Sequence, residues 1–201
     1  NRHCVCKYMA TNKQRREATR ASILTAAREC FVRDGYGNTH TDTILESAQI
    51  SRGAMYHHFS SKRDVFEAVY VSVVKESIDY ALGAAEDSGS PVEDLVTACT
   101  AWLGLVRKPA IASILIEQGP QVLGWKRARE IESESSLTPM RIAVERACSA
   151  GEMDVPSVEV AAMLINALLA EAALISLYRK PKVPLAVQEE SVRRFIEGLG
   201  K

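Results

Sequence analysis

The stretch THTDTILESAQISRGAMYHHFSSK, residues 39–62, decides the fold because it contains two closely spaced helix starts. Thr39 and Asp42 have the spacing in which a hydroxyl caps free backbone N–H groups and an acid three residues later favours the positive helix end. This spacing predicts a helix that begins near His40. The apolar side of that helix is short, and the helix extends for only about two turns before residues 49–51.

Ser51 is placed to open a second helix as its N-cap, and Met55 and Phe59 lie one turn apart on the inner face of that helix. The outward side chains are Arg52, Tyr56 and His57 or His58. Two short helices joined by a tight turn, the second with basic and aromatic groups outward, are the layout of a helix-turn-helix whose second helix enters the DNA major groove.

A longer pattern around these helices is specific in residue type. It consists of Gly35-Tyr36-x-x-Thr39, Ala48-x-Ile50-Ser51, Arg52-Gly53-Ala54-Met55-Tyr56-His57-His58-Phe59 and Lys62. This pattern, within residues 20–66, resembles the N-terminal domain of the TetR family of bacterial transcriptional regulators. Two positions depart from the family: Gln49 stands where glycine is usual, and Thr41 replaces an apolar residue. Because a non-glycine residue with positive φ is strained, either the turn differs slightly or Gln49 adopts it at a cost.

The resemblance implies an all-α protein with an N-terminal three-helix DNA-binding domain and a C-terminal helical domain for ligand binding and dimerisation. The implied function is that of a ligand-responsive dimeric repressor, released from a palindromic operator by an apolar small molecule. The expected DNA-contacting residues are Thr39, Ser51, Arg52, Gly53, Tyr56, His57, His58 and Lys62. The expected phosphate-backbone contacts among them are Thr39, Tyr56, His58 and Lys62. Ser51 or Arg52 is the expected base reader, and a phosphate contact is the alternative for Arg52.

The charge of the chain is divided unevenly. The 201 residues have a net charge of zero, which by itself argues against a nucleic-acid partner. Residues 1–63 contain 11 Lys and Arg against 5 Asp and Glu, a net charge of +6, whereas residues 64–201 contain 14 against 20, a net charge of −6. The basic part includes one face of the first helix, with Lys13, Arg15, Arg16 and Arg20. This face is either an ordinary solvated surface or an approach to double-stranded DNA, the partner expected for this half.

The five cysteines are an odd number without framework spacing, which predicts thiols in a reducing cytoplasm. Three of them, Cys30, Cys99 and Cys148, fall in apolar helical patterns and are expected to be buried. His3-Cys4-x-Cys6 lacks a second Cys/His pair to complete a metal site, so neither a metal nor a cofactor is expected. Met9-Ala10 resembles a natural start, so residues 1–10 are interpreted as a non-native or disordered extension.

No stretch alternates with the period of a strand, so the chain is predicted to be helical throughout. Ser61-x-x-Asp64 is expected to cap a long helix that ends near residue 86. This helix joins the DNA-binding domain, residues 11–62, to the ligand-binding and dimerisation domain, residues 63–201. The other expected helices are 11–34, 92–106, 110–117, a charged helix ending at 134, 138–150, 156–179 and 185–199, with residues 119–125 as a loop.

Residues 156–179 are apolar almost all round and therefore must be covered on every side. Glu159, Asn166 and Glu171 argue against a membrane span. The final helix has a seven-residue apolar seam of Leu185, Val192, Phe195, Ile196 and Leu199. Paired with the same two helices of a second chain, the seam predicts a four-helix homodimer interface. The alternative is that it closes only the chain's own core.

A ligand cavity is expected between the long helix, the helix at 92–106 and the helix at 156–179. The expected lining residues are Tyr70, Val74, Trp102, Leu103, Met140, Met163 and Asn166. Such aromatic and Met side chains are more often plain core, but as a set they fit an apolar small molecule, which Asn166 or Glu171 would orient.

Other functions predict different features. A DNA-binding protein controlled by a protein partner would have a dry C-terminal core, and an enzyme would need polar groups that converge there. The sequence has no phosphate loop, nucleophile elbow or paired helix histidines. Tyr56-His57-His58 has no carboxylate nearby in the chain to orient a general acid or base, so no enzyme is expected.

Overall fold

The computed structural model describes residues 2–85 and 87–200, with side chains from residue 12 onward. Every regular element in these ranges is helical, which confirms the predicted fold class. The chain divides into two compact units between Tyr70 and Val71, within one helix. The predicted domain boundary lay a few residues earlier, at 62/63. The extension proposed for residues 1–10, with Cys4 and Cys6, has side chains outside the described part.

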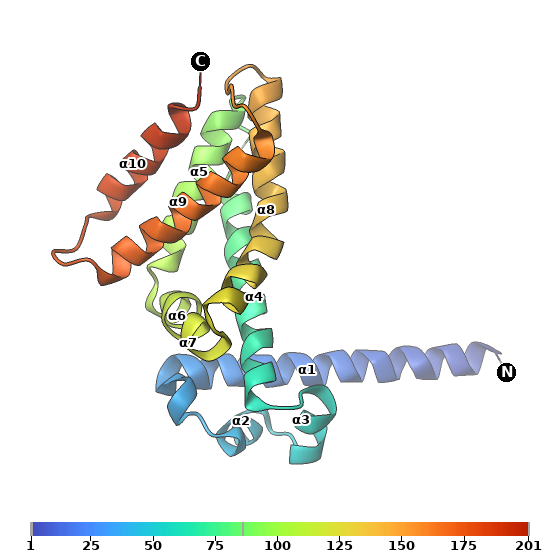
Figure 1. Cartoon of the computed structure of the whole chain (residues 1–201). Helices are drawn as coiled ribbons and strands as arrows, with labels where there is room; N and C mark the ends of the chain where they lie inside the picture. The colour runs from blue at the N-terminus through green and yellow to red at the C-terminus, as the bar shows by residue number, and fades with distance from the viewer. Residues whose placement is uncertain (1, 86, 201) are drawn as a thin grey trace. The chain divides into compact units, whose positions relative to one another are not determined.

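The N-terminal unit contains α1 (Arg2–Asn38), α2 (Thr41–Ala48), α3 (Arg52–His58) and the beginning of α4 (Lys62–Ala84) (Figure 1). Gly35 interrupts α1 with φ 76°, close to where the sequence predicts its end. Three aromatic rings hold α1 against α4: the centroid of Phe66 lies 5.2 Å from Phe31 and 5.3 Å from Tyr36. The inward residues predicted for α3 and its end, Met55 and Phe59, are both buried.

The helix caps confirm two predictions and correct one. Ser51 accepts a hydrogen bond from the Ala54 N–H, and Ser61 accepts one from the Asp64 N–H, so both cap as predicted. Thr39 does not cap α2, whose N-cap is His40, without a side-chain bond. The Thr39 hydroxyl instead donates to the carbonyls of Cys30 and Gly35 in α1. These carbonyls lie near the interruption of α1. Because they accept the hydroxyl proton, the Thr39 side chain is directed toward α1 and away from α2.

Gln49 adopts the turn that the family pattern usually assigns to glycine. Its φ is 55° and its ψ 43°, and it is the one non-glycine residue with positive φ in the described chain. The Gln49 N–H donates to the Glu46 carbonyl and the Ile50 N–H to the Leu45 carbonyl, so the turn closes the end of α2. Of the two possibilities for this turn, the chain takes the strained backbone.

The C-terminal unit contains the rest of α4 and all the later helices. These are α5 (Pro91–Val106), α6 (Pro109–Ala112), the π-helical turn η1 (Ser113–Gln118), α7 (Gly119–Leu123), α8 (Trp125–Ser149), α9 (Val158–Tyr178) and α10 (Leu185–Glu197). Residues of α5, α8, α9 and α10 form one apolar core, in which Val96, Leu103, Val144, Ile165 and Ile196 are fully buried. Arg193 of α10 adds a two-pronged ion pair to Glu93 of α5, with N–O distances of 2.6 and 2.9 Å.

Two element predictions in this unit are wrong. The loop expected at 119–125 is mostly the helix α7, because Pro120 sits in its first turn, where a missing N–H costs no helical bond. Only Gly124, with φ 83°, breaks the chain before α8. The two helices expected at 125–150 are one helix with Pro139 inside it. Its buried residues lie on both sides of Pro139, so packing offsets the roughly 3 kcal/mol that an internal proline costs.

The strained turn yields a stability prediction. Gln49→Gly should raise the free energy of unfolding by about 1 kcal/mol, because relief of left-handed strain exceeds the extra chain entropy of glycine. The matched control is Ser47→Gly, at an exposed position inside α2. This variant should lower the free energy of unfolding by about 1 kcal/mol. Urea unfolding followed by circular dichroism measures both. Equal destabilisation by the two variants would contradict a strained turn at Gln49.

Candidate DNA-binding surface and internal cavity

The outer face of α3 carries most of the residues predicted to contact DNA. Arg52, Gly53, Tyr56 and His57 are exposed, and His58 is half-buried. Tyr56 is 49% exposed, so its phenol belongs to this outer face. A Cβ added at Gly53 would meet no atom within 4 Å, so the backbone there is open to close approach. Ser51 is exposed as well, and its hydroxyl proton remains available while its oxygen caps the helix.

An ion pair links α2 to α3 beside this face. Arg52 Nη2 lies 2.5 Å from Asp42 Oδ1, and both side chains are more than 60% exposed, at 62% and 64%. Such an exposed pair contributes little to stability. The ion pair does fix a position, because it holds the Arg52 guanidinium beside the start of α2.

Two predicted contacts are directed into the protein. Thr39 is 1% exposed, with its hydroxyl bonded to α1. The Lys62 ammonium donates to the carbonyls of Tyr36 and Thr39, both at 2.8 Å, and lies 4.2 Å from the centroid of the Tyr36 ring. Burial lowers the pKa of Lys62 from its ordinary value. Lys62 therefore joins the start of α4 to the segment between α1 and α2.

Basic residues of α1 adjoin the end of α3. The Arg20 guanidinium carbon lies 5.3 Å from the centroid of the Phe59 ring, the C-cap of α3. Partial burial lowers the pKa of His58, and the charges of His57, Arg16 and Arg20 lower it further. The helical spacing of Arg16 and Arg20 in the sequence is the signal for this second set of cations. Together these groups make a basic surface suited to phosphate oxygens.

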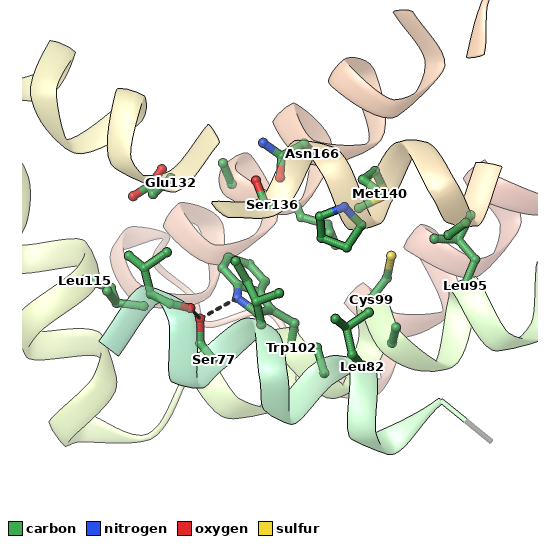
Figure 2. Close-up of a pocket in the computed structure, with 18 of the residues that line it drawn as sticks. Ser77, Leu82, Leu95, Cys99, Trp102, Leu115, Glu132, Ser136, Met140 and Asn166 are labelled. Carbon is green, nitrogen blue, oxygen red and sulfur yellow. Dashed lines mark hydrogen bonds between the residues drawn. The ribbon is translucent and has the colours of Figure 1, made fainter. Parts of the chain in front are cut away.

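A cavity of about 420 Å³, partly open to solvent, lies in the C-terminal unit between the second half of α4, helices α5, α8 and α9, and the segment of η1 and α7 (Figure 2). Four of the seven predicted lining residues face it: Val74, Trp102, Met140 and Asn166. The other three do not line it: Leu103 is fully buried in the core, Met163 is 51% exposed, and Tyr70 packs beside Phe66 in the N-terminal unit. The cavity is lined mainly by apolar side chains, which suits a small apolar ligand.

A hydrogen bond crosses the wall of the cavity from α5 to α4. The Trp102 Nε1–H donates to the Ser77 hydroxyl at 3.2 Å, and Ser77 donates to the Val74 carbonyl at 2.7 Å (Figure 2). Sequence reasoning missed Ser77. Its signal was a single polar residue inside the apolar stripe of α4, one turn after Val74.

The cysteine in the wall is unreactive. Burial raises the pKa of the Cys99 thiol to about 12, so it is a neutral apolar group at physiological pH. Cys30 is also buried, as predicted, and Cys148 is half-buried. Among the side chains from residue 12 onward, no three His, Cys, Asp or Glu residues gather as a metal site.

A second apolar feature is the outer face of α9 and α10. On α9, Val160, Met163 and Leu164 are exposed at one-turn spacing, and on α10 Phe195 is 52% exposed. The predicted seam of α10 divides: Val192 and Ile196 are buried in the chain's own core, and Phe195 faces outward. By length and composition α9 resembles a membrane span, a property that it shares with core helices of soluble proteins.

Both units match models of known protein families. Residues 23–69 match the model described as bacterial regulatory proteins of the tetR family. Residues 92–199 match the model described as the tetracyclin repressor-like C-terminal domain. The second match covers α5 to α10 except for Pro91, the first residue of α5.

Individual relatives agree with these matches. The chain is 27% identical over 183 residues to the HTH-type transcriptional repressor Rv1474c of Mycobacterium tuberculosis, covering 88% of this chain and 94% of that protein. It is 43% identical over 56 residues to the regulator SrpR of Pseudomonas putida, which is 28% of this chain and 26% of SrpR.

Solved structures show the same fold. A TetR-family regulator from Pectobacterium atrosepticum has a TM-score of 0.77 at 24% identity, over 93% of this chain and 96% of that one. RolR in complex with resorcinol has a TM-score of 0.73 at 16% identity, over 94% of this chain and 90% of RolR. With the helix-turn-helix geometry and both family matches in agreement, the chain belongs to the TetR family of DNA-binding transcriptional regulators.

Proposed function

We propose that this regulator is a homodimeric repressor that a largely apolar small molecule releases from an inverted-repeat operator. The observation that carries the proposal is the cavity of about 420 Å³, whose wall includes Val74 and Ser77 of α4. The same helix begins at Lys62 in the DNA-binding unit. A ligand that prefers one position of α4 therefore has a continuous helix through which to affect DNA binding.

The family and its neighbours support ligand control. Rv1474c is named a repressor, and RolR was solved with resorcinol, so this fold accommodates a small organic ligand in at least that protein. A regulator controlled by a protein partner would have no need of an internal cavity. Since relatives of this chain are transcriptional regulators, the cavity is proposed as a binding site without catalysis.

The exposed faces of α9 and α10 support the dimer. Apolar side chains at Val160, Met163, Leu164 and Phe195 lie on two helices that pack against each other, as Figure 1 shows. Large exposed apolar side chains that gather on neighbouring helices are typical of an interaction site. A second copy of the same face would cover it with the two-fold symmetry that an inverted repeat requires.

The Trp102–Ser77 bond is the proposed connection between ligand and α4. Ser77 is 1% exposed and its hydroxyl is bonded on both sides, so displacement of the indole removes a donor from a buried group. A ligand that moves Trp102 therefore changes the preferred position of α4. In the dimer, the two α3 helices would then lose their register with successive major grooves.

A direct test selects DNA from a random library with the full-length protein. An inverted repeat with half-site centres roughly 34–36 Å apart is expected, since two α3 helices must enter successive major grooves. A compound that stabilises the protein should then release this DNA. Selection of a single, non-repeated site would contradict the dimeric arrangement.

The first prediction concerns Arg52. Arg52 is the first residue of α3, and the N-terminal residues of a recognition helix contact base edges, so if Arg52 reads a base, Arg52→Ala should relax sequence preference at one position by about 1–3 kcal/mol. The salt dependence of binding should stay unchanged. Fluorescence anisotropy across operator variants and salt concentrations measures both, with Arg194→Ala, an exposed cation on α10, as control. A uniform loss with a log–log salt slope reduced by about 0.9 would make Arg52 a phosphate contact.

The second prediction concerns the dimer. Phe195→Asp should convert the dimer to a folded monomer, because it buries an unpaired carboxylate in the interface, whereas the side chain is half-exposed in one chain. Sedimentation velocity measures the mass and circular dichroism the fold. Ile142→Asp is the matched control, since Ile142 is 47% exposed on α8. A dimer that survives Phe195→Asp would place the interface elsewhere.

The third prediction concerns the switch. Trp102→Phe keeps the apolar bulk but removes the bond to Ser77, so it should weaken release by the effector about threefold to tenfold. Operator affinity without effector should change little. Ser77→Ala should have the same effect, and the double variant no more than either one, because both remove one interaction.

The effector for this comparison of single and double variants is a compound that raises the melting temperature of the full-length protein. Thr100→Val is the control, because the Thr100 hydroxyl bonds the Val96 carbonyl within α5 and is not part of the wall. Additive effects of the two wall variants would show that the bond does not transmit the signal.

A further inference from the structure

Most of the cavity wall offers a ligand no polar partner. Apolar side chains come from every surrounding helix, including Val74, Leu95, Leu115 and Leu169. The Trp102 indole N–H is directed to Ser77. A ligand of this cavity therefore has a predominantly hydrocarbon surface.

Three charged groups of the wall, Arg129, Glu132 and Asp94, have partners of their own. Arg129 Nη1 lies 3.3 Å from Glu132 Oε2, so the two charges compensate each other. Asp94 accepts hydrogen bonds from both the N–H and the hydroxyl of Ser88, which hold its pKa below the usual range, and the charge of Arg146 acts in the same direction. Asp87 and Arg146, also in the wall, are exposed to solvent. A charged ligand group bound among the apolar side chains, away from these exposed residues, would lose its hydration without a counter-charge, which is costly.

Ser136 is different, because its hydroxyl is buried without any hydrogen-bond partner among the described residues. Other hydroxyls inside helices of this chain donate to the carbonyl four residues earlier. Thr100 does so to Val96 at 2.9 Å, and Ser191 does so to Val187 at 2.6 Å. A buried polar group left without this common partner requires another one.

Asn166 is a second neutral polar residue of the wall, and its side chain is half-buried. Its amide lines the cavity and makes no hydrogen bond with the described part of the chain. Figure 2 shows Asn166 of α9 and Ser136 of α8 on the same side of the cavity, opposite Ser77 and Trp102 of the α4 and α5 side. Both groups are neutral, and each can donate and accept a hydrogen bond.

We infer that the cavity selects an uncharged, largely hydrophobic molecule with one hydroxyl or carbonyl group, which Ser136 and Asn166 bind. A ligand hydroxyl can accept from the Asn166 amide and donate to Ser136, and a carbonyl oxygen can accept from both. A hydrocarbon would leave the two groups unpaired, and a carboxylate beside them would exchange its hydration for two neutral partners. This inference rests on the proposed function only in taking the cavity as a ligand site.

The test uses three probes of one ring system: 1-naphthol, naphthalene and 1-naphthoate. Isothermal titration calorimetry with the full-length protein should give a dissociation constant for 1-naphthol about tenfold below those of the other two. Ser136→Ala and Asn166→Leu should each bring the dissociation constant of naphthol to within about threefold of that of naphthalene, because each removes one of the two polar partners. Ser135→Ala, at a neighbouring residue outside the wall, should keep the full preference.

Three results would overturn the inference: equal binding of naphthalene and naphthol, tighter binding of naphthoate, or no binding of any probe up to its solubility. Melting temperatures of the variants identify any loss of fold, and the milder Ser136→Ala keeps the test valid if Asn166→Leu is unstable. Operator release is measured separately. A naphthol preference that depends on Ser136, without release of DNA by any bound compound, would support the binding chemistry and contradict the proposed switch.

Discussion

One helix has to satisfy two separate cores. The first turns of α4 bury Phe66 against Phe31 and Tyr36, while Lys62 fixes its start through the carbonyls of Tyr36 and Thr39. Farther along, Val74 and Ser77 form part of a cavity wall in the other unit. Because a packed aromatic cluster resists small displacements, the start of α4 cannot slide independently of α1. Any change in the position of its second half must be accommodated by the helix as a body.

The sequence predicts the elements of the N-terminal unit well because their signals are local. Ser51 caps α3 and Ser61 caps α4 as expected, each by accepting from the backbone N–H three residues later. Gln49 occupies the left-handed turn that the pattern requires. Thr39 shows the limit. Its local pattern favours a cap, but the hydroxyl finds two carbonyls of α1, which only the folded arrangement brings within reach. Lys62 turned inward for the same reason, so a residue type suited to phosphate does not establish where its side chain points.

The cavity was predictable only in part, because its lining depends on rotation of helices about their axes. Trp102 and Leu103 are neighbours in sequence, yet they point about 100° apart on α5, and one lines the cavity while the other is core. Ser136 lies in a segment that the sequence assigned to no helix. The sequence pattern predicts that one helix ends at 134 and another begins at 138, whereas α8 continues through both and through Pro139, which brings Ser136 to the wall. Packing over 25 residues outweighs a local signal of one residue.

The energy of the proposed switch reaches the usual size of an allosteric coupling only if two chains act together. A neutral hydrogen bond such as that between Trp102 and Ser77 contributes about 0.5–1.5 kcal/mol, less than the typical allosteric coupling of roughly 1–3 kcal/mol. A dimer contains the bond twice, so the breaking of both would supply about 1–3 kcal/mol to one operator complex. A monomer would have only half of that energy and a single α3 to bind DNA. If the exposed face of α9 and α10 is the dimer interface, as proposed, it would affect the size of the ligand response as much as DNA affinity, since it would join two weak couplings into one.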